Sequence, residues 1–303
     1  MAERNRASLS RDASGGLWST VSRHPFAAFL VLVFALTGMV EVVPAPEGVH
    51  GALENILGAA VPAIVVTAIV GGRAGVHDLV RRSLRWRVPL RWYVVSLLAL
   101  PIAVLLLAPA LYGSAPLRAL TENWPLLFTS FLPTLAVMVV FNSVAEEAGW
   151  TGFLFARLQE RHRPLRAALL AAVPFCLWHL VSFVHDSGSL LMGAALAAYL
   201  LLPLVASRLV IGWLYNASGT SVLIGGLFHA MHNATVNPTG LGVAVLDLPQ
   251  DDVLFLVSLL VVVAAVVVVV VTHGRLGLPH PREGGKPATQ AGGGASSVGR
   301  PTS

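Results

Sequence analysis

The chain has 303 residues, of which 55% are hydrophobic and only 12% are charged, and its mean hydropathy is +0.74. A soluble domain of this length needs about twice that charged fraction to cover its surface, so the composition excludes an ordinary soluble protein and indicates a surface that faces lipid. The net charge of +5 comes from basic residues between apolar segments, which we interpret as determinants of membrane topology and not as a nucleic-acid-binding surface.

Long apolar segments recur along the whole chain. They lie at about 26–43, 52–71, 93–112, 125–146, 166–184, 189–215, 219–235 and 252–272. Each is long enough, or nearly so, to cross ~30 Å of hydrocarbon as a helix. Lipid offers no hydrogen-bond partner to backbone N–H and C=O groups, and a helix satisfies these groups internally. The sequence therefore predicts an all-α, polytopic transmembrane helix bundle with about eight spans. We expect the first span to be an uncleaved membrane helix, because its basic lead-in is longer than that of a usual signal peptide.

Every second connection between these segments is rich in arginine. The basic residues stand at Arg4, Arg6, Arg11 and Arg23, at Arg73, Arg81, Arg82, Arg85, Arg87 and Arg91, at Arg157, Arg161, Arg163 and Arg166, and at Arg275, Arg282 and Lys286. The positive-inside rule then predicts a multi-pass plasma-membrane protein with both termini in the cytoplasm. We expect a cytoplasmic segment at 1–24, a transmembrane domain at 25–274, and a disordered cytoplasmic tail at 275–303, where Pro, Gly, Ser and Ala dominate.

The connection after the second span alternates apolar residues with Arg81, Arg82, Arg85 and Arg87. This pattern favours an amphipathic helix at the membrane interface, with its arginines near anionic headgroups. An ordinary basic loop is the alternative interpretation.

Ionisable residues inside apolar spans cost at least ~2.5 kcal/mol each on insertion scales, so each one needs a reason. Glu146 and Glu147 stand together at the end of the fourth apolar segment, within EEAGWTGF. Adjacent residues on a helix point about 100° apart. One carboxylate can therefore face a cavity as a general base while a neighbouring group holds the other. The alternative is a helix end at which both glutamates are solvated.

Other polar side chains lie in the later apolar segments. His179, in FCLWH, shares a helix face with Phe175. His229 and Asn233, in HAMHN, are also four residues apart, so an imidazole and an amide can donate to one oxyanion. Packing for His179, and hydrogen bonds between helices for the other pair, are the alternatives. Arg208, in the sixth segment, either balances a carboxylate or extends to the interface.

A carboxylate pair, two histidines and an amide on three helices are together the parts of water-mediated acyl hydrolysis. The sequence holds neither a GxSxG serine motif nor an HExxH zinc motif. We therefore expect a base, an orienting imidazole and an oxyanion-binding pair around one water-accessible cavity that faces the cytoplasm.

These segments resemble the CPBP family of intramembrane proteases, also called the CAAX prenyl protease 2 or Abi family. The family signature is a double glutamate followed by an arginine, then FxxxH, then HxxxN or HxxxD, each on its own membrane helix. The three motifs occur here in the same order, as Glu146-Glu147, Phe175 to His179, and His229 to Asn233. The resemblance implies a CPBP-like core at about 120–235 and the bacterial branch of the family.

The resemblance also implies a role for each motif residue. Glu146 would be the base that activates water, and His179 would help to position that water. His229 and Asn233 would stabilise the oxyanion, while Glu147 would organise the site without contacting the reacting atoms itself.

Phe175 would likewise support the site without touching the reacting atoms.

Members of the family have been labelled intramembrane metalloproteases, and Glu146, His179 and His229 form a His2Glu set of the kind that binds zinc with an open position for water. A metal-free glutamate mechanism fits the resemblance as well. We prefer that mechanism and leave the cofactor as none or zinc.

One position departs from the family pattern. The arginine expected after the double glutamate falls at position 151, where this chain has Thr151. If that arginine pairs with the second glutamate, Glu147 has lost its partner, and Arg157 is not an obvious substitute. A protonated Glu147 or an inactive site would follow.

We predict an intramembrane endopeptidase, a hydrolase that cuts a membrane-associated peptide or protein in the lipid bilayer by glutamate-activated water. A CAAX substrate needs prenylated cysteine, a eukaryotic modification, so a bacterial homologue must cut another peptide. A non-catalytic scaffold or bacteriocin-immunity protein on the same fold is one alternative. A transporter or proton relay is another, although the sequence lacks the repeats that transporters show.

Overall fold

The computed structural model describes residues 16, 18–44 and 46–278, and every regular element in that part of the chain is a helix. The prediction of an all-α fold is therefore confirmed. Most of the predicted cytoplasmic segment at 1–24, and all of the predicted disordered tail beyond residue 278, lie outside the described residues. Those two domain predictions stay predictions.

The helices follow one another with short connections. Segments labelled η are π-helical, which means that each N–H bonds to the carbonyl five residues before it. In chain order the elements are α2 (Pro25–Glu41), α3 (Glu47–Asn55), η1 (Ile56–Ala60), α4 (Val61–Ser83), α5 (Leu90–Tyr112), α6 (Ala115–Glu122), η2 (Leu127–Phe131), α7 (Leu132–Met138), η3 (Val139–Glu146), η4 (Ala148–Phe155), α8 (Ala156–Gln159), α9 (Pro164–Ser187), α10 (Leu190–Ala217), α11 (Val222–Val236), η5 (Leu241–Val245) and α12 (Gln250–Val271).

Six helical stretches among the described residues are long and apolar enough to cross a membrane. They are Val49–Ser83, Leu90–Tyr112, Leu127–Gln159, Pro164–Ser187, Leu190–Ala217 and Gln250–Val271. The shorter apolar helix α2 and the 15-residue α11, most of which is buried, correspond to the two remaining predicted segments. The chain is thus a multi-pass bundle, and the side of the membrane on which its ends lie stays a prediction.

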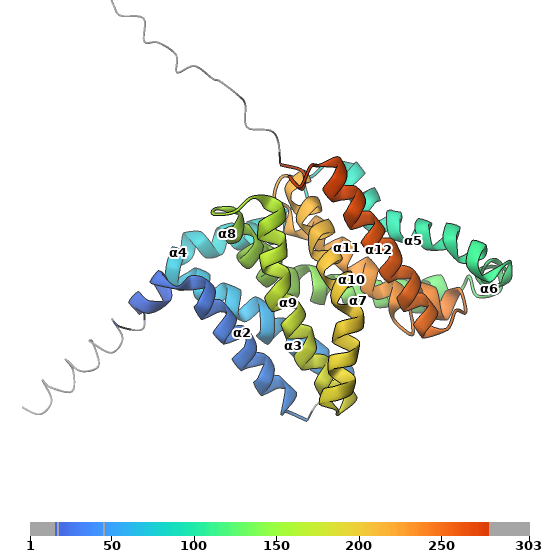
Figure 1. The fold of residues 1–303 in the computed structure, drawn as a ribbon, viewed down its shortest axis with the longest axis horizontal. Helices are drawn as coiled ribbons and strands as arrows, with labels where there is room; N and C mark the ends of the chain where they lie inside the picture. Colours follow the sequence, from blue (N-terminus) through green and yellow to red (C-terminus); the bar gives the residue numbers. More distant parts are fainter. Residues whose placement is uncertain (1–15, 17, 45, 279–303) are drawn as a thin grey trace, which may run out of the picture.

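Helices α9, α10 and α11 occupy the middle of the bundle, with α2 on one side of the view and α5 and α6 on the other (Figure 1). Helix α10 packs along α9 and α12, and α11 packs against η3 and α5. One part of the core is aromatic: the indole of Trp150, which is fully buried, contacts the rings of Phe29, Phe175 and Trp178. Through these contacts η4 is held to α2 and α9.

Large apolar side chains also cover much of the outer surface. Leu106, Leu191 and Val271 are 73%, 78% and 72% exposed. A soluble protein would rarely present contiguous apolar surface of this extent to water, so these faces are suited to contact with lipid.

Helix α4 bends at Gly72, whose φ of 58° lies in the left-handed region that favours glycine. Beyond the bend the helix runs on to Ser83 and carries Arg81 and Arg82, whereas Arg85 and Arg87 lie in the irregular connection after it, so only the first part of the predicted amphipathic segment is helical. From this second half of α4, Arg82 reaches back to the bundle. Its Nη1 donates to the carbonyl oxygen of Gly152 at 3.0 Å and to the hydroxyl of Tyr215 at 3.1 Å.

Helix α11 approaches η3 so closely that a side chain is excluded at the contact. A Cβ atom placed on Gly226 would lie 2.4 Å from the Cα of Ser143, a separation that real Cβ atoms essentially never show. The backbones of the two helices therefore meet at this glycine.

We expect Gly226→Ala to destabilise the protein by about 1–3 kcal/mol, because the added methyl group must push α11 away from η3. The matched control is Gly38→Ala in α2, where a Cβ would meet nothing within 4 Å. Thermal unfolding of the purified protein in detergent compares the two variants. Equal melting temperatures would contradict the close contact between α11 and η3.

Candidate active site

Glu146 and Glu147 lie at the junction of η3 and η4, in the middle of the helical stretch Leu127–Gln159. Their exposed fractions are 2% and 0%. The alternative of a helix end with two solvated glutamates is therefore wrong. The apolar residues after Glu147 continue the helix into the interior of the bundle, so both carboxylates lie away from water.

Glu147 is held by three other side chains. Its two oxygens accept hydrogen bonds from Nη1 and Nη2 of Arg208 at 2.7 and 2.8 Å, and Oε1 also lies 2.8 Å from Nδ1 of His229. The hydroxyl of Thr151 donates to Oε2 and accepts a bond of 2.5 Å from Arg208. Since Arg208 is only 2% exposed, this is a fully buried, bidentate ion pair with its remaining bonding positions filled.

The prediction that Glu147 has lost its partner is therefore wrong. Its arginine is Arg208 of α10 and not a residue at position 151. The hydroxyl of Thr151 bonds to both the carboxylate and the guanidinium. Arg157, the other arginine considered, lies over the ring of Phe153 at 4.7 Å. Of the two interpretations of Arg208, the structure supports the one in which it balances a carboxylate.

Glu146 has one bonded oxygen and one unbonded oxygen. Its Oε2 accepts a hydrogen bond of 2.9 Å from Nδ2 of Asn142, one helical turn earlier. Its Oε1 is buried and has no hydrogen-bond partner among the described residues, and Nε2 of His229 lies 4.0 Å from it. Asn142 was not among the predicted site residues, although a polar amide four positions before a glutamate in an apolar run was a usable signal.

His229 is the residue that joins the two glutamates. It extends from α11, is 6% exposed, and presents Nδ1 to Glu147 and Nε2 to Glu146. A neutral ring that donates its Nδ1 proton to Glu147 keeps a lone pair on Nε2, whereas a charged ring has a donor on each side. The close contact of α11 with η3 at Gly226, one turn earlier, is what brings the ring this near to both carboxylates.

His179 packs against the ring of Phe175, which also lies near His229 and Arg208. The ring of Phe175 lies with its centroid 4.4 Å from that of His179 and 6.4 Å from that of His229, and the guanidinium of Arg208 lies over it at 4.7 Å. Nδ1 of His179 pairs with the carbonyl oxygen of Phe175 at 3.0 Å. Among the described residues, no hydrogen bond or ion pair joins His179 to Glu146.

Asn233 also stands apart from the glutamates. It is partly exposed, and its Oδ1 lies 3.0 Å from Nδ1 of His232. Among the described residues, its amide nitrogen makes no hydrogen bond. The structure thus brings Glu146, Glu147 and His229 into direct contact range, and it places His179 and Asn233 nearby without such a contact.

The three central residues could offer ligand atoms to a metal ion, because one atom from each lies within 4.8 Å of the others. Both oxygens of Glu147, however, are already bonded to the cationic Arg208, which would repel a second cation. Glu146 and His229 then remain as two donors, fewer than the three protein ligands of catalytic zinc sites. The predicted set of Glu146, His179 and His229 does not come together within this distance among the described residues.

Glu146, Glu147 and His229 are all buried. None of the three lines the open cavity of about 850 Å³ that is bordered by His50, Glu54, Phe141, His185 and Asp186. The expectation of one water-accessible cavity shared by the predicted catalytic residues stays a prediction.

Comparisons with known proteins agree with the motif order. Residues 128–235 match the model of a family described as Type II CAAX prenyl endopeptidase Rce1-like. The chain is 28% identical over 140 residues to a CAAX prenyl protease 2 from Methanococcus maripaludis, a match that covers 43% of this chain. The chain spans about half the length of this curated relative, 49%. The resemblance to the CAAX prenyl protease 2 family is thereby confirmed for the part of the chain that carries the glutamates and His229.

We expect Arg208→Gln to destabilise the protein by about 3–5 kcal/mol, because it leaves the carboxylate of Glu147 buried without its counter-charge. The matched control is Arg73→Gln, which changes an exposed arginine of α4. Adding Thr151→Arg to Arg208→Gln should recover part of the loss, since residue 151 already contacts the same carboxylate. Thermal unfolding measures all four proteins. If the double variant is no more stable than Arg208→Gln alone, the claim that an arginine at position 151 can replace Arg208 as the partner of Glu147 is contradicted.

Proposed function

We propose that the chain is an intramembrane endopeptidase of the CAAX-protease type, a hydrolase that cuts a membrane-associated peptide or protein. One observation carries the proposal: the buried Oε1 of Glu146 has no hydrogen-bond partner among the described residues, while the neighbouring Glu147 is fully bonded. The two carboxylates therefore differ in availability. Glu146 is free to exchange a proton, and Glu147 is committed to holding Arg208 and His229.

In the proposed reaction, Oε1 of Glu146 takes a proton from a water molecule as the water oxygen attacks the carbonyl carbon of the scissile peptide bond. The carbonyl oxygen becomes an oxyanion. When the bond to nitrogen breaks, the protonated Glu146 returns its proton to the leaving amine. One group thus acts first as the base and then as the acid, so atoms and charges balance over the cycle.

We assign the oxyanion to the α11 side of the site. When the ring of His229 carries both protons, Nδ1–H is held by Glu147 and Nε2–H can donate to the oxyanion. Asn233, one turn further along the same helix, would add its amide as a second donor. The ion pair of Glu147 with Arg208 fixes the ring, because it holds the carboxylate that His229 donates to.

The role of His179 is positioning of the water or of the substrate chain. Its Nδ1 is oriented by the carbonyl of Phe175, and its ring packs on the face of that residue, next to His229.

We further propose that the protein lies in a bacterial plasma membrane with both termini in the cytoplasm, as the arginine-rich connections predict. The substrate is a membrane-associated peptide other than a prenylated CAAX sequence, and no metal or nucleic acid takes part.

We expect Glu146→Gln to lower the rate of peptide cleavage by at least about 100-fold, because the amide cannot accept the proton of water. The measurement uses purified protein in lipid nanodiscs with a peptide library, read by mass spectrometry. Glu160→Gln, which changes an exposed glutamate at the end of α8, is the matched control.

Equal cleavage by the wild type and Glu146→Gln would reject Glu146 as the base. A scaffold function predicts instead that Glu146→Gln, stably expressed, rescues a deletion phenotype as well as the wild type does. One argument for that alternative, the missing partner of Glu147, is removed by Arg208. A proton relay predicts proton flux into liposomes that Glu146→Gln abolishes.

A further inference from the structure

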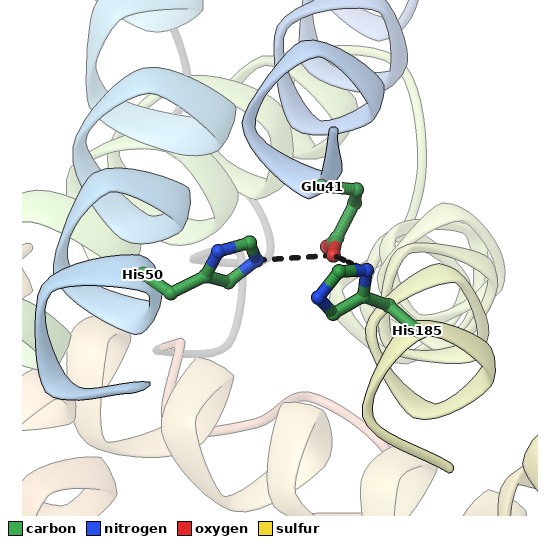
Figure 2. A group of neighbouring side chains, drawn as sticks. All are labelled: Glu41, His50 and His185. Atoms are coloured by element: carbon green, nitrogen blue, oxygen red, sulfur yellow. Dashed lines mark hydrogen bonds and ion pairs between the residues drawn. The ribbon is translucent and has the colours of Figure 1, made fainter. Parts of the chain in front are cut away.

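A second polar cluster lies apart from the two central glutamates, where the ends of three helices meet. Glu41 is the last residue of α2, His50 lies in α3, and His185 lies in the last turn of α9. Figure 2 shows the two imidazole rings pointing to the same carboxylate from opposite helices. Nε2 of His50 and Nδ1 of His185 each lie 3.0 Å from Oε2 of Glu41.

The path of the chain explains why these three residues meet. Helix α3 begins six residues after α2 ends, and α2 packs against both α9 and η1, the segment that directly follows α3. A hydrogen bond from the hydroxyl of Ser182 in α9 to the carboxylate of Glu54 in α3 also joins these two helices. The two imidazole rings are stacked, with centroids 4.7 Å apart and planes 8° from parallel.

We propose that Glu41, His50 and His185 bind a divalent transition-metal ion of the zinc type. Two imidazole nitrogens and one carboxylate oxygen are a donor set that such ions prefer, and the three ligand atoms lie within 4.8 Å of one another. Bond lengths of about 2.0–2.1 Å at tetrahedral angles place ligand atoms about 3.3 Å apart. The two nitrogen-to-oxygen separations of 3.0 Å need to widen by only a few tenths of an ångström, and the two nitrogens lie within 4.8 Å of each other.

A second observation points to a ligand at this place. The side chain of Glu41 is only 9% exposed, and its Oε1 is buried without a hydrogen-bond partner among the described residues. A buried carboxylate oxygen normally has a partner. A bound cation would provide that partner, either by taking both oxygens of Glu41 or by ordering water around the one it leaves.

The cluster is open to solvent on one side. His50 and His185 both border the open cavity of about 850 Å³, together with Glu54 and Asp186. The acidic side chains favour the entry of a cation, and the cavity leaves room for a water ligand at the remaining coordination position. The site is separate from the proposed hydrolytic centre and does not depend on it, although His185 lies six residues after His179 on the same helix.

The test uses the full-length protein, purified with a tag that contains no histidine, stripped with a chelator and titrated with Zn²⁺ and Co²⁺. Calorimetry and the visible absorption of Co²⁺ report binding, and thermal unfolding reports folding with and without metal. The variants are Glu41→Gln and His50→Ala/His185→Ala. The controls are His77→Ala/His162→Ala, which removes two histidines elsewhere, and His229→Ala, which breaks the other candidate group.

We expect one equivalent of metal to bind to the wild type and to both controls, and to raise their melting temperatures. Each cluster variant should bind at least about 100-fold more weakly and show no metal-dependent rise in melting temperature. Glu41→Gln nearly preserves the shape of the side chain, so it separates loss of a ligand from loss of folding. Absence of binding to the wild type, binding unchanged in the cluster variants, or binding lost only in His229→Ala would overturn the proposal.

Discussion

Two opposite charges enclosed in an apolar bundle must compensate each other, because either one alone would be buried without a counter-charge at a cost of several kcal/mol. Arg208 of α10 and Glu147 at the η3–η4 junction meet this requirement with two parallel hydrogen bonds. His229 of α11 joins the same carboxylate. Three helices are thus held at one point, and Glu146, the preceding residue in the chain, is held with them.

The arrangement separates two tasks between neighbouring residues of identical type. Glu147 serves as the fixed anion around which cationic and donor groups assemble, while Glu146 keeps an oxygen unbonded. Thr151 belongs to the same arrangement, since its hydroxyl contacts both members of the ion pair. A short residue at this position leaves space for the guanidinium that arrives from α10.

Much of this organisation could be predicted from the sequence, because the relevant signals are local. Apolar segments of membrane length predict helices, and each buried polar residue is conspicuous against them. The order of the motifs identified Glu146, Glu147, Phe175, His179, His229 and Asn233 as one group. The structure brings three of them, Glu146, Glu147 and His229, within 4.8 Å of one another. The arginine at position 208 was also noted, since it interrupts a long apolar segment.

The remaining features depend on how distant segments pack. Arg208 pairs with a glutamate 61 residues earlier, and no spacing rule indicates which carboxylate it will meet. The helix continues past Glu147 because Trp150 and its neighbours are needed in the aromatic core, a requirement that only the assembled bundle reveals. His179 and Asn233 share helix faces with their motif partners as expected, but helix rotation and side-chain rotamers decide whether they touch the glutamates.

The bend of α4 at Gly72 has a mechanical consequence. Beyond the bend, Arg82 holds the carbonyl of Gly152, which lies on the helix that carries both glutamates, five residues after Glu147. A displacement of this arginine-rich half-helix would therefore pull directly on the helix that carries the two glutamates. If the half-helix rests on the headgroups, as its composition predicts, lateral pressure or lipid charge at the membrane surface would act as a force on the segment that carries Glu146 and Glu147.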